Sequence, residues 1–205
     1  VRQRVTIMGS YEATATSLRY SKTLVCSVRC VEKTEESHTV WVKFKVTGTD
    51  GDLDGAQVVI WTTTPWTMPS NKAVVYGEGI SYGLYEVTAT PEECWANVGD
   101  RYLLADDLAA DVFARARLED GMWQRVRGVE NDELAKVSLL HPLAGAEGAN
   151  GEWDDLRDFR AADFVTSDEG TGFVHCAPSH GLEEYELYRD LGMLPQVITY
   201  NVMED

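Results

Sequence analysis

The segment from Val58 to Asn71, VVIWTTTPWTMPSN, constrains the fold more than any other part of the chain. It opens with a β-branched and aromatic run, Val58–Trp61, which is typical of a buried strand. Three threonines follow, and Pro65 then prevents a central strand from continuing. The pattern predicts a strand that ends in a row of hydroxyl groups beside a turn. These hydroxyls either line a site between Trp61 and Trp66 or satisfy backbone groups within the turn itself.

The formal net charge of −16 argues against a broad nucleic-acid footprint on this chain. Asp and Glu outnumber Lys and Arg by 34 to 18, whereas proteins that grip many phosphates carry a basic stripe. Contact with nucleic acid is therefore expected only at a small local pocket. No apolar run approaches the roughly 20 residues that span a bilayer, and no signal-peptide core begins the chain. We expect a cytoplasmic, monomeric domain without a membrane partner, whose four cysteines are thiols rather than a disulfide framework.

Alternating and continuous apolar patterns predict a β-rich fold. Residues Val40–Val46 alternate with period two, the turn-forming segment Gly48–Gly55 follows, and a hairpin would then lead into Val58–Trp61. Further strands are expected at Lys72–Tyr76, Tyr82–Val87, Met122–Val129, Phe164–Thr166 and Phe173–Cys176, with a weaker signal at Leu24–Val28. The segment Gly145–Asp155 has the composition of an acidic surface loop.

Helical spacing is confined to a few stretches. Glu92–Val98 and Tyr102–Leu118 are expected to be helical. The apolar stripe of the second stretch comprises Leu103, Leu104, Leu108, Val112 and Phe113. Ser179 is predicted to cap another helix, which runs to Leu191 and stops at Gly192. Together these patterns favour a mixed, β-rich α+β fold.

The sequence FVTSDEGTGFVHCAPSHGLEEY gathers a second set of polar candidates. His175, Cys176 and His180 are zinc-ligand types, but they lack helical spacing and a second ligand cluster, so no metal is expected. Cys176 with His180 as nucleophile and base stays open. It also stays open whether His175 is only a histidine whose hydrogen bonds are satisfied at the edge of a core. Glu183 and Glu184 fit the solvated face of a helix, although Glu184 could equally supply a carboxylate beside His175.

Together, WTTTPWTMPSN and GTGFVHCAPSHG resemble the editing domain of isoleucyl-tRNA synthetase, a class I aminoacyl-tRNA synthetase. The resemblance covers residues 38–205, whereas residues 1–37 match the family poorly. Related editing domains of valyl- and leucyl-tRNA synthetases carry an Arg after paired threonines, where this chain has Thr64, as in the isoleucyl type. The resemblance implies a β-barrel-centred domain with peripheral helices. It also implies that ATP is used elsewhere, in the ligase domain of a parent enzyme.

The activity implied by the resemblance is hydrolysis of valine wrongly esterified to the 3′ adenosine of isoleucine tRNA, without a cofactor. One methylene is worth only about 1–3 kcal/mol in a binding pocket, a limit for which this family is the standard illustration. A second site must therefore remove the smaller amino acid. Thr63, Thr64, His175 and Glu184 would act catalytically, by positioning water and the oxyanion. Substrate contacts would come from Trp61, Thr62, Trp66, Thr67, Asn71, Gly172, His175 and Glu184.

Two of these roles are specific. His175 would bound the side-chain pocket and exclude isoleucine. Glu184 stands where the family has an Asp that holds the substrate ammonium, and its extra methylene predicts a less rigid hold. The implied partners are the acceptor end of the tRNA and the remainder of the synthetase. The alternative is a non-catalytic insertion that only docks the tRNA end or another protein; the threonines and His175 favour catalysis, whereas Glu184 and the acidic surface favour docking.

Overall fold

The computed structural model describes residues 2–8, 12–15, 26–29 and 32–198. The chain divides into two compact units, Val1–Thr39 and Val40–Asp205. In the first unit two antiparallel pairs form, β1 with β4 and β2 with β3. Their bounds are Arg2–Met8 for β1, Glu12–Ala15 for β2, Cys26–Arg29 for β3 and Glu32–His38 for β4. Strand β3 overlaps the weak signal at Leu24–Val28, of which Leu24 and Val25 lie outside the described residues.

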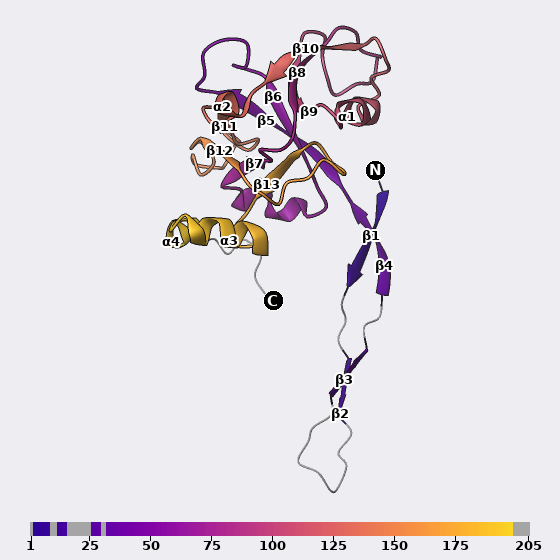
Figure 1. The fold of residues 1–205 in the computed structure, drawn as a ribbon, viewed down its shortest axis with the longest axis vertical. Coiled ribbons are helices and arrows are strands. Elements are labelled where there is room, and N and C mark those ends of the chain that lie inside the picture. The colour runs from indigo at the N-terminus through magenta and orange to yellow at the C-terminus, as the bar shows by residue number, and fades with distance from the viewer. Residues whose placement is uncertain (1, 9–11, 16–25, 30–31, 199–205) are drawn as a thin grey trace, which may run out of the picture. The chain divides into compact units, whose positions relative to one another are not determined.

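A nine-stranded mixed sheet organises the second unit (Figure 1). In order of pairing its strands are β10 (Trp123–Val129), β8 (Tyr82–Val87), β9 (Arg101–Ala105), β6 (Gln57–Thr62), β5 (Val40–Thr47), β11 (Ser138–Leu140), β12 (Arg157–Ala161), β7 (Ala73–Tyr76) and β13 (Phe173–Cys176). The β6–β9 and β7–β12 pairs are parallel. The other pairs are antiparallel, including the predicted β5–β6 hairpin.

The helices of the second unit are short. They are the 3-10 helix η1 (Pro65–Ser70) and the α-helices α1 (Ala109–Arg115), α2 (Asn131–Leu134), α3 (Leu182–Asp190) and α4 (Leu194–Val197). None of the helices within the described ranges is both long and apolar enough to cross a lipid bilayer. The predicted β-rich α+β class is confirmed.

The predicted β-barrel is wrong, because the described sheet does not close. Its edge strands, β10 and β13, are not paired with each other. The sheet curls nevertheless: the Ala105 amide at the end of β9 donates to the Thr171 carbonyl at 3.2 Å. The Tyr82 hydroxyl of β8 likewise donates to the Gly172 carbonyl at 2.8 Å. Gly172 has a φ of 79°, so a turn stands where closing strand pairs would have to form.

Both faces of the central strands are buried, which explains their continuous apolar sequences. On β6, Val58 and Ile60 face the inner core, while Val59 packs in a second cluster with Phe113 of α1. On β7, consecutive valines divide in the same way between the inner core and a third cluster, which side chains of α3 and α4 complete. The strand ends are therefore the first places where polar side chains can gather.

The helix predicted at Tyr102–Leu118 is a strand in its first part. Leu103 faces the inner core and Leu104 faces the cluster against α1, so β9 buries consecutive residues on opposite faces. The same apolar run also fits a helical stripe, and periodicity alone does not separate the two. Helix α1 begins only at Ala109. The second predicted helix, Glu92–Val98, consists of turns and bends.

Other boundaries also differ from the prediction. The predicted strand Phe164–Thr166 is absent: Phe164 lies in a turn, which the Val165 amide closes on the Ala162 carbonyl, and Val165 and Thr166 are irregular. Strand β12 was not predicted from the apolar pattern, because three of its five residues are charged. Helix α3 is preceded by Gly181 rather than by a capping Ser179, and it ends before Gly192, which has the φ of 69° expected of a helix stop.

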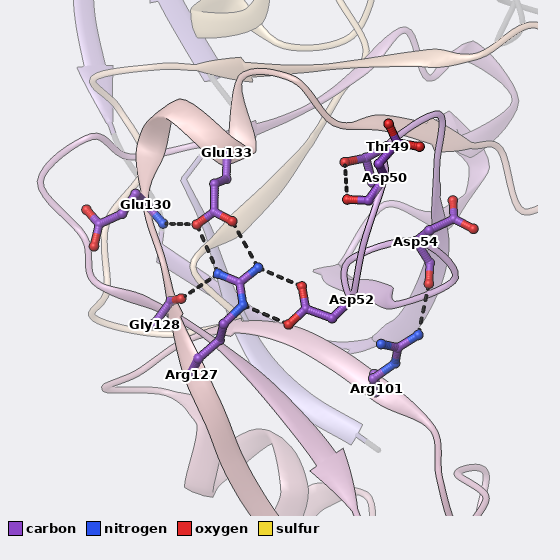
Figure 2. Close-up of polar contacts among 9 residues, drawn as sticks. All are labelled: Thr49, Asp50, Asp52, Asp54, Arg101, Arg127, Gly128, Glu130 and Glu133. Atoms are coloured by element: carbon purple, nitrogen blue, oxygen red, sulfur yellow. Dashed lines mark hydrogen bonds and ion pairs between the residues drawn. The ribbon is translucent and has the colours of Figure 1, made fainter.

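An ion-pair network anchors the predicted turn between β5 and β6 (Figure 2). Arg127 of β10 donates to both carboxylate oxygens of Asp52, at 2.8 and 2.7 Å. It also binds Glu133 of α2, at 3.0 and 2.9 Å. These hydrogen bonds from Arg127 lower the pKa of the Asp52 and Glu133 carboxyls. Leu53, next to Asp52, is buried, so the loop covers part of the inner core.

Candidate functional site

The candidate site forms where β6 and η1 meet the end of β13. Pro65 ends the strand and begins η1. Thr62 Oγ1 accepts the backbone N–H of Thr64 at 3.1 Å and lies 3.2 Å from Thr64 Oγ1. The amide and hydroxyl of Thr67 donate to the Thr64 carbonyl at 3.0 and 2.8 Å. The threonines therefore do stabilise the turn, as the simpler interpretation of the sequence expects.

His175 of β13 is held in one orientation by residues of the η1 segment. Its Nε2 lies 2.8 Å from Thr67 Oγ1, and its Nδ1 lies 3.0 Å from Asn71 Nδ2. Asn71 Nδ2 also donates to the Ala73 carbonyl at 2.7 Å. Because a carbonyl can only accept, the amide nitrogen of Asn71 must face both partners, and Nδ1 of His175 must accept. The proton of the neutral ring is therefore on Nε2, where it is donated to Thr67.

Burial keeps this imidazole neutral. His175 is only 8% exposed. Its burial, reinforced by nearby His141 and His180, lowers the pKa of His175 to about 4. Protonation would also place an Nδ1–H against the amide N–H of Asn71, because Asn71 is fixed by its own hydrogen bond. At neutral pH the His175 ring is therefore uncharged, and its two hydrogen bonds hold it in one orientation.

We expect the free energy of unfolding to decrease as the pH falls from about 6.5 to about 4. Burial lowers the pKa of His141 to about 4 as well, and its Nδ1 accepts the Leu143 amide at 3.1 Å. Below pH 6.5, the ordinary pKa of histidine, the unfolded chain binds protons at His141 and His175 that the folded chain does not bind. The stabilisation is thus complete above 6.5 and is lost toward 4.

At ~1.4 kcal/mol per pKa unit, the loss is on the order of 3 kcal/mol for each histidine. Denaturant unfolding of the chain across this pH range measures it, and His141→Gln should remove about half of the dependence. An unfolding free energy that stays constant over the range would contradict the prediction.

A pocket of about 140 Å³ opens between the two segments. It is lined by Trp61, Thr62, Thr64, Thr67, Val174, His175, Ala177, His180, Gly181 and Glu184. The space is several times the ~30 Å³ that one water molecule occupies in the liquid, so a small organic group fits. Six predicted site residues therefore come together here, from β6, η1, β13 and α3.

Glu184 supplies the one carboxylate among the described residues that line the pocket. It is the third residue of α3. Burial raises the pKa of the Glu184 carboxyl, its own backbone amide opposes the shift, and Glu183 adds to it. A carboxylate that has lost water is stabilised by a nearby cation. The pocket is therefore suited to a small group that carries a positive charge, such as a primary ammonium.

Four predicted site residues, Thr63 among them, do not line the pocket. Asn71 is fully buried and acts on the pocket only through His175. Trp66 is 57% exposed on η1, outside the lining. Gly172 belongs to the turn before β13, where a Cβ would overlap a side chain of β9. The glycine at position 172 is thus explained by its close approach to β9 and its positive φ.

Four lining residues are absent from the predicted set: Val174, Ala177, His180 and Gly181. His180 is exposed, and its Nε2 lies 3.1 Å from the hydroxyl of the fully buried Ser70. The sequence offers His180 as a possible metal ligand or base, and the only sequence signal for the other three residues is their place in the same continuous motif as His175.

The structure argues against Cys176 as a nucleophile. Its side chain is fully buried in the third apolar cluster with Ala73 and Tyr188. Burial raises the pKa of the Cys176 thiol, which disfavours the reactive thiolate. No group of three or more His, Cys, Asp or Glu side chains within the described ranges is arranged to hold a metal ion.

A larger hollow of about 300 Å³ lies beside β8 and β10. Arg125 and Asp106 line it, but they bind each other through two hydrogen bonds of 2.9 and 2.8 Å. Arg125 and Asp106 are thus paired with each other, and none of the predicted site residues lines this hollow, so we take the smaller pocket as the candidate site.

Two solved structures share the fold at low sequence identity. The crystal structure of GlLeuRS-CP1 matches with a TM-score of 0.52 and 17% identity, over 69% of this chain and 48% of that chain. The P. knowlesi cytosolic leucyl-tRNA synthetase editing domain matches with a TM-score of 0.50 and 13% identity, over 72% and 55%. At such identities the likeness concerns the fold alone.

Curated relatives are much closer in sequence. The chain is 71% identical over 171 residues to the isoleucine–tRNA ligase of Ruegeria pomeroyi, covering 83% of this chain and 17% of that protein. It is 45% identical over 158 residues to the Brucella abortus ligase, covering 76% and 16%. It is 44% identical over 190 residues to the Bradyrhizobium diazoefficiens ligase, covering 87% and 18%. No family model matches the chain.

The fold is shared with a solved editing domain of a leucyl-tRNA synthetase. The relatives make the assignment specific: the chain belongs to the isoleucine–tRNA ligase family, and it spans less than a fifth of the length of the relatives it matches. The family predicted from the two motifs is confirmed.

Proposed function

We propose that this segment hydrolyses valyl-tRNA(Ile), as the editing domain of a cytoplasmic isoleucine–tRNA ligase. The observation that carries the proposal is one small pocket that combines the carboxylate of Glu184, the neutral ring of His175 and the hydroxyl of Thr64. The ammonium of an aminoacyl ester would bind Glu184 through a charge-assisted hydrogen bond. Its side chain would rest against His175, and its carbonyl would face the threonine turn.

The proposed reaction needs no protein nucleophile. Water attacks the ester carbonyl, the bond between the carbonyl carbon and the 3′ oxygen breaks, and valine and a free 3′ hydroxyl leave. His175 donates its Nε2 proton to Thr67 and accepts from Asn71 at Nδ1, so both ring nitrogens are occupied. Positioning of water and the oxyanion by the threonine turn would therefore supply the rate enhancement.

Deacylation assays test the proposal directly. A full-length ligase that carries this segment should hydrolyse valyl-tRNA(Ile) and spare isoleucyl-tRNA(Ile). Treatment with a chelator should leave this hydrolysis unchanged, because no metal is required. Failure to hydrolyse either ester would refute the proposal and favour the docking alternative, and equal hydrolysis of both would contradict the proposed selectivity.

Replacing Thr63 and Thr64 together with Val should slow valyl-tRNA(Ile) hydrolysis about tenfold or more, because both hydroxyls are lost while β-branching is kept. Thr64 lines the pocket and Thr63 does not, so Thr64→Val alone should account for most of the effect. Single-turnover rates and thermal unfolding of the three variants measure this. Full activity of the double variant, at unchanged thermal stability, would show that the hydroxyls are dispensable.

A further inference from the structure

Gly181 occupies a position in the pocket where the backbone does not require glycine. Its φ of −134° and ψ of 141° are extended, and any residue adopts them. It precedes α3 at the position where Ser, Thr, Asp or Asn would stabilise the helix start. Neither local conformation nor helix capping therefore explains the absence of a side chain.

The carboxylate of Glu184 fills the space that a side chain at Gly181 would need. A Cβ built on Gly181 would overlap Oε2 and Cδ of Glu184, and even Oε1 would lie 2.8 Å away. The three heavy atoms nearest to that Cβ all belong to Glu184. Glu184 is the third residue of α3, the position from which a glutamate folds back toward the helix start.

We propose that Gly181 is a positioning residue, which leaves room for the folded Glu184 side chain and so holds its carboxylate in the pocket. This inference rests on the proposed function and adds a structural requirement to it. A glutamate is longer than an aspartate, so it keeps its carboxylate at the first turn of α3 only by folding back over a residue without a Cβ. In this position the carboxylate lines the pocket, where it would bind the ammonium of an aminoacyl ester.

Single-turnover hydrolysis of valyl-tRNA(Ile) by the full-length ligase tests the inference. Gly181→Ala should slow hydrolysis about tenfold or more, because the new Cβ displaces the carboxylate. The same change in a Glu184→Asp background should cost less than about twofold, because the shorter side chain withdraws its oxygens from residue 181. If Gly181 had only a structural role, Glu184→Asp would not reduce the effect of Gly181→Ala.

Gly79→Ala is the matched control. Gly79 is exposed, no heavy atom lies within 4 Å of a Cβ built there, and it is not part of the candidate pocket. This variant should keep the parent rate. The inference is overturned if Gly181→Ala hydrolyses the ester as fast as the parent. It is also overturned if Gly181→Ala slows the Glu184→Asp enzyme by the same factor as it slows the parent.

Thermal unfolding separates this inference from the proposed function. Gly181→Ala should change the melting temperature little, because the atoms displaced are the far end of a flexible side chain. If it unfolds the domain instead, Gly181→Ala combined with Glu184→Ala decides: restored folding identifies the carboxylate as the obstacle, and persistent unfolding overturns the inference. A parent enzyme that does not hydrolyse valyl-tRNA(Ile) would refute the proposed function, whereas an active parent with an equally active Gly181→Ala variant would overturn this inference alone.

Discussion

Glu184→Ala should abolish valyl-tRNA(Ile) hydrolysis, whereas Glu184→Asp should preserve or raise it. No other carboxylate lines the pocket within the described part of the chain. A charge-assisted hydrogen bond between a carboxylate and an ammonium is stronger than a neutral one, and stronger again where water is excluded. Asp keeps this charge and removes one rotatable bond, so it should hold the ammonium at least as rigidly.

Glu183→Ala is the matched control for this experiment. Glu183 neighbours Glu184 on the first turn of α3, but it is exposed and does not line the pocket. Its removal should leave the rate close to that of the parent and control for the loss of negative charge at the helix start. Single-turnover rates of the four proteins decide the matter. If the Glu184→Ala enzyme is as fast as the parent, then Glu184 does not bind the substrate ammonium.

Local patterns in the sequence predicted the two segments that build the site. The strand Val58–Trp61 and the turn at Pro65 follow from β-branched residues and a proline, which act through neighbours in the chain. The strand that carries His175 is predictable in the same way, because a glycine turn next to it in the chain marks where it begins. Identifying the family then brought the two segments together, which spacing alone could not do.

The parts that could not be predicted depend on contacts between distant residues. The run at Tyr102–Leu104 satisfies both helical and strand patterns, and only pairing with β6 and β8 decides between them. Whether the sheet closes likewise depends on pairing between strands far apart in the sequence, which the local turn signal at Gly172 does not reveal. Asn71 acts through His175, which lies far away in the sequence. Gly181 acts through Glu184, three residues later. Both roles become visible only in the three-dimensional structure.

The second large effect is expected at the wall of the pocket. His175→Ala should allow the enzyme to hydrolyse correctly charged isoleucyl-tRNA(Ile). The buried, neutral imidazole is fixed by Thr67 and Asn71, so it cannot swing aside for a larger side chain. Its removal opens space at one side of the pocket. Because one methylene is worth about 1–3 kcal/mol, the ratio of isoleucine to valine hydrolysis should rise by about tenfold or more.

The substitution also removes a hydrogen-bond partner from Asn71 and Thr67, and each such loss costs about 1–3 kcal/mol when the remaining group is buried. Thermal unfolding must therefore accompany the assay. Asn71→Ala is the matched variant, since it removes support from the ring but leaves the imidazole in place. It should lower valine hydrolysis without raising isoleucine hydrolysis. If folded His175→Ala loses activity toward valine and gains none toward isoleucine, then His175 positions water or the terminal adenosine and does not set the size of the pocket.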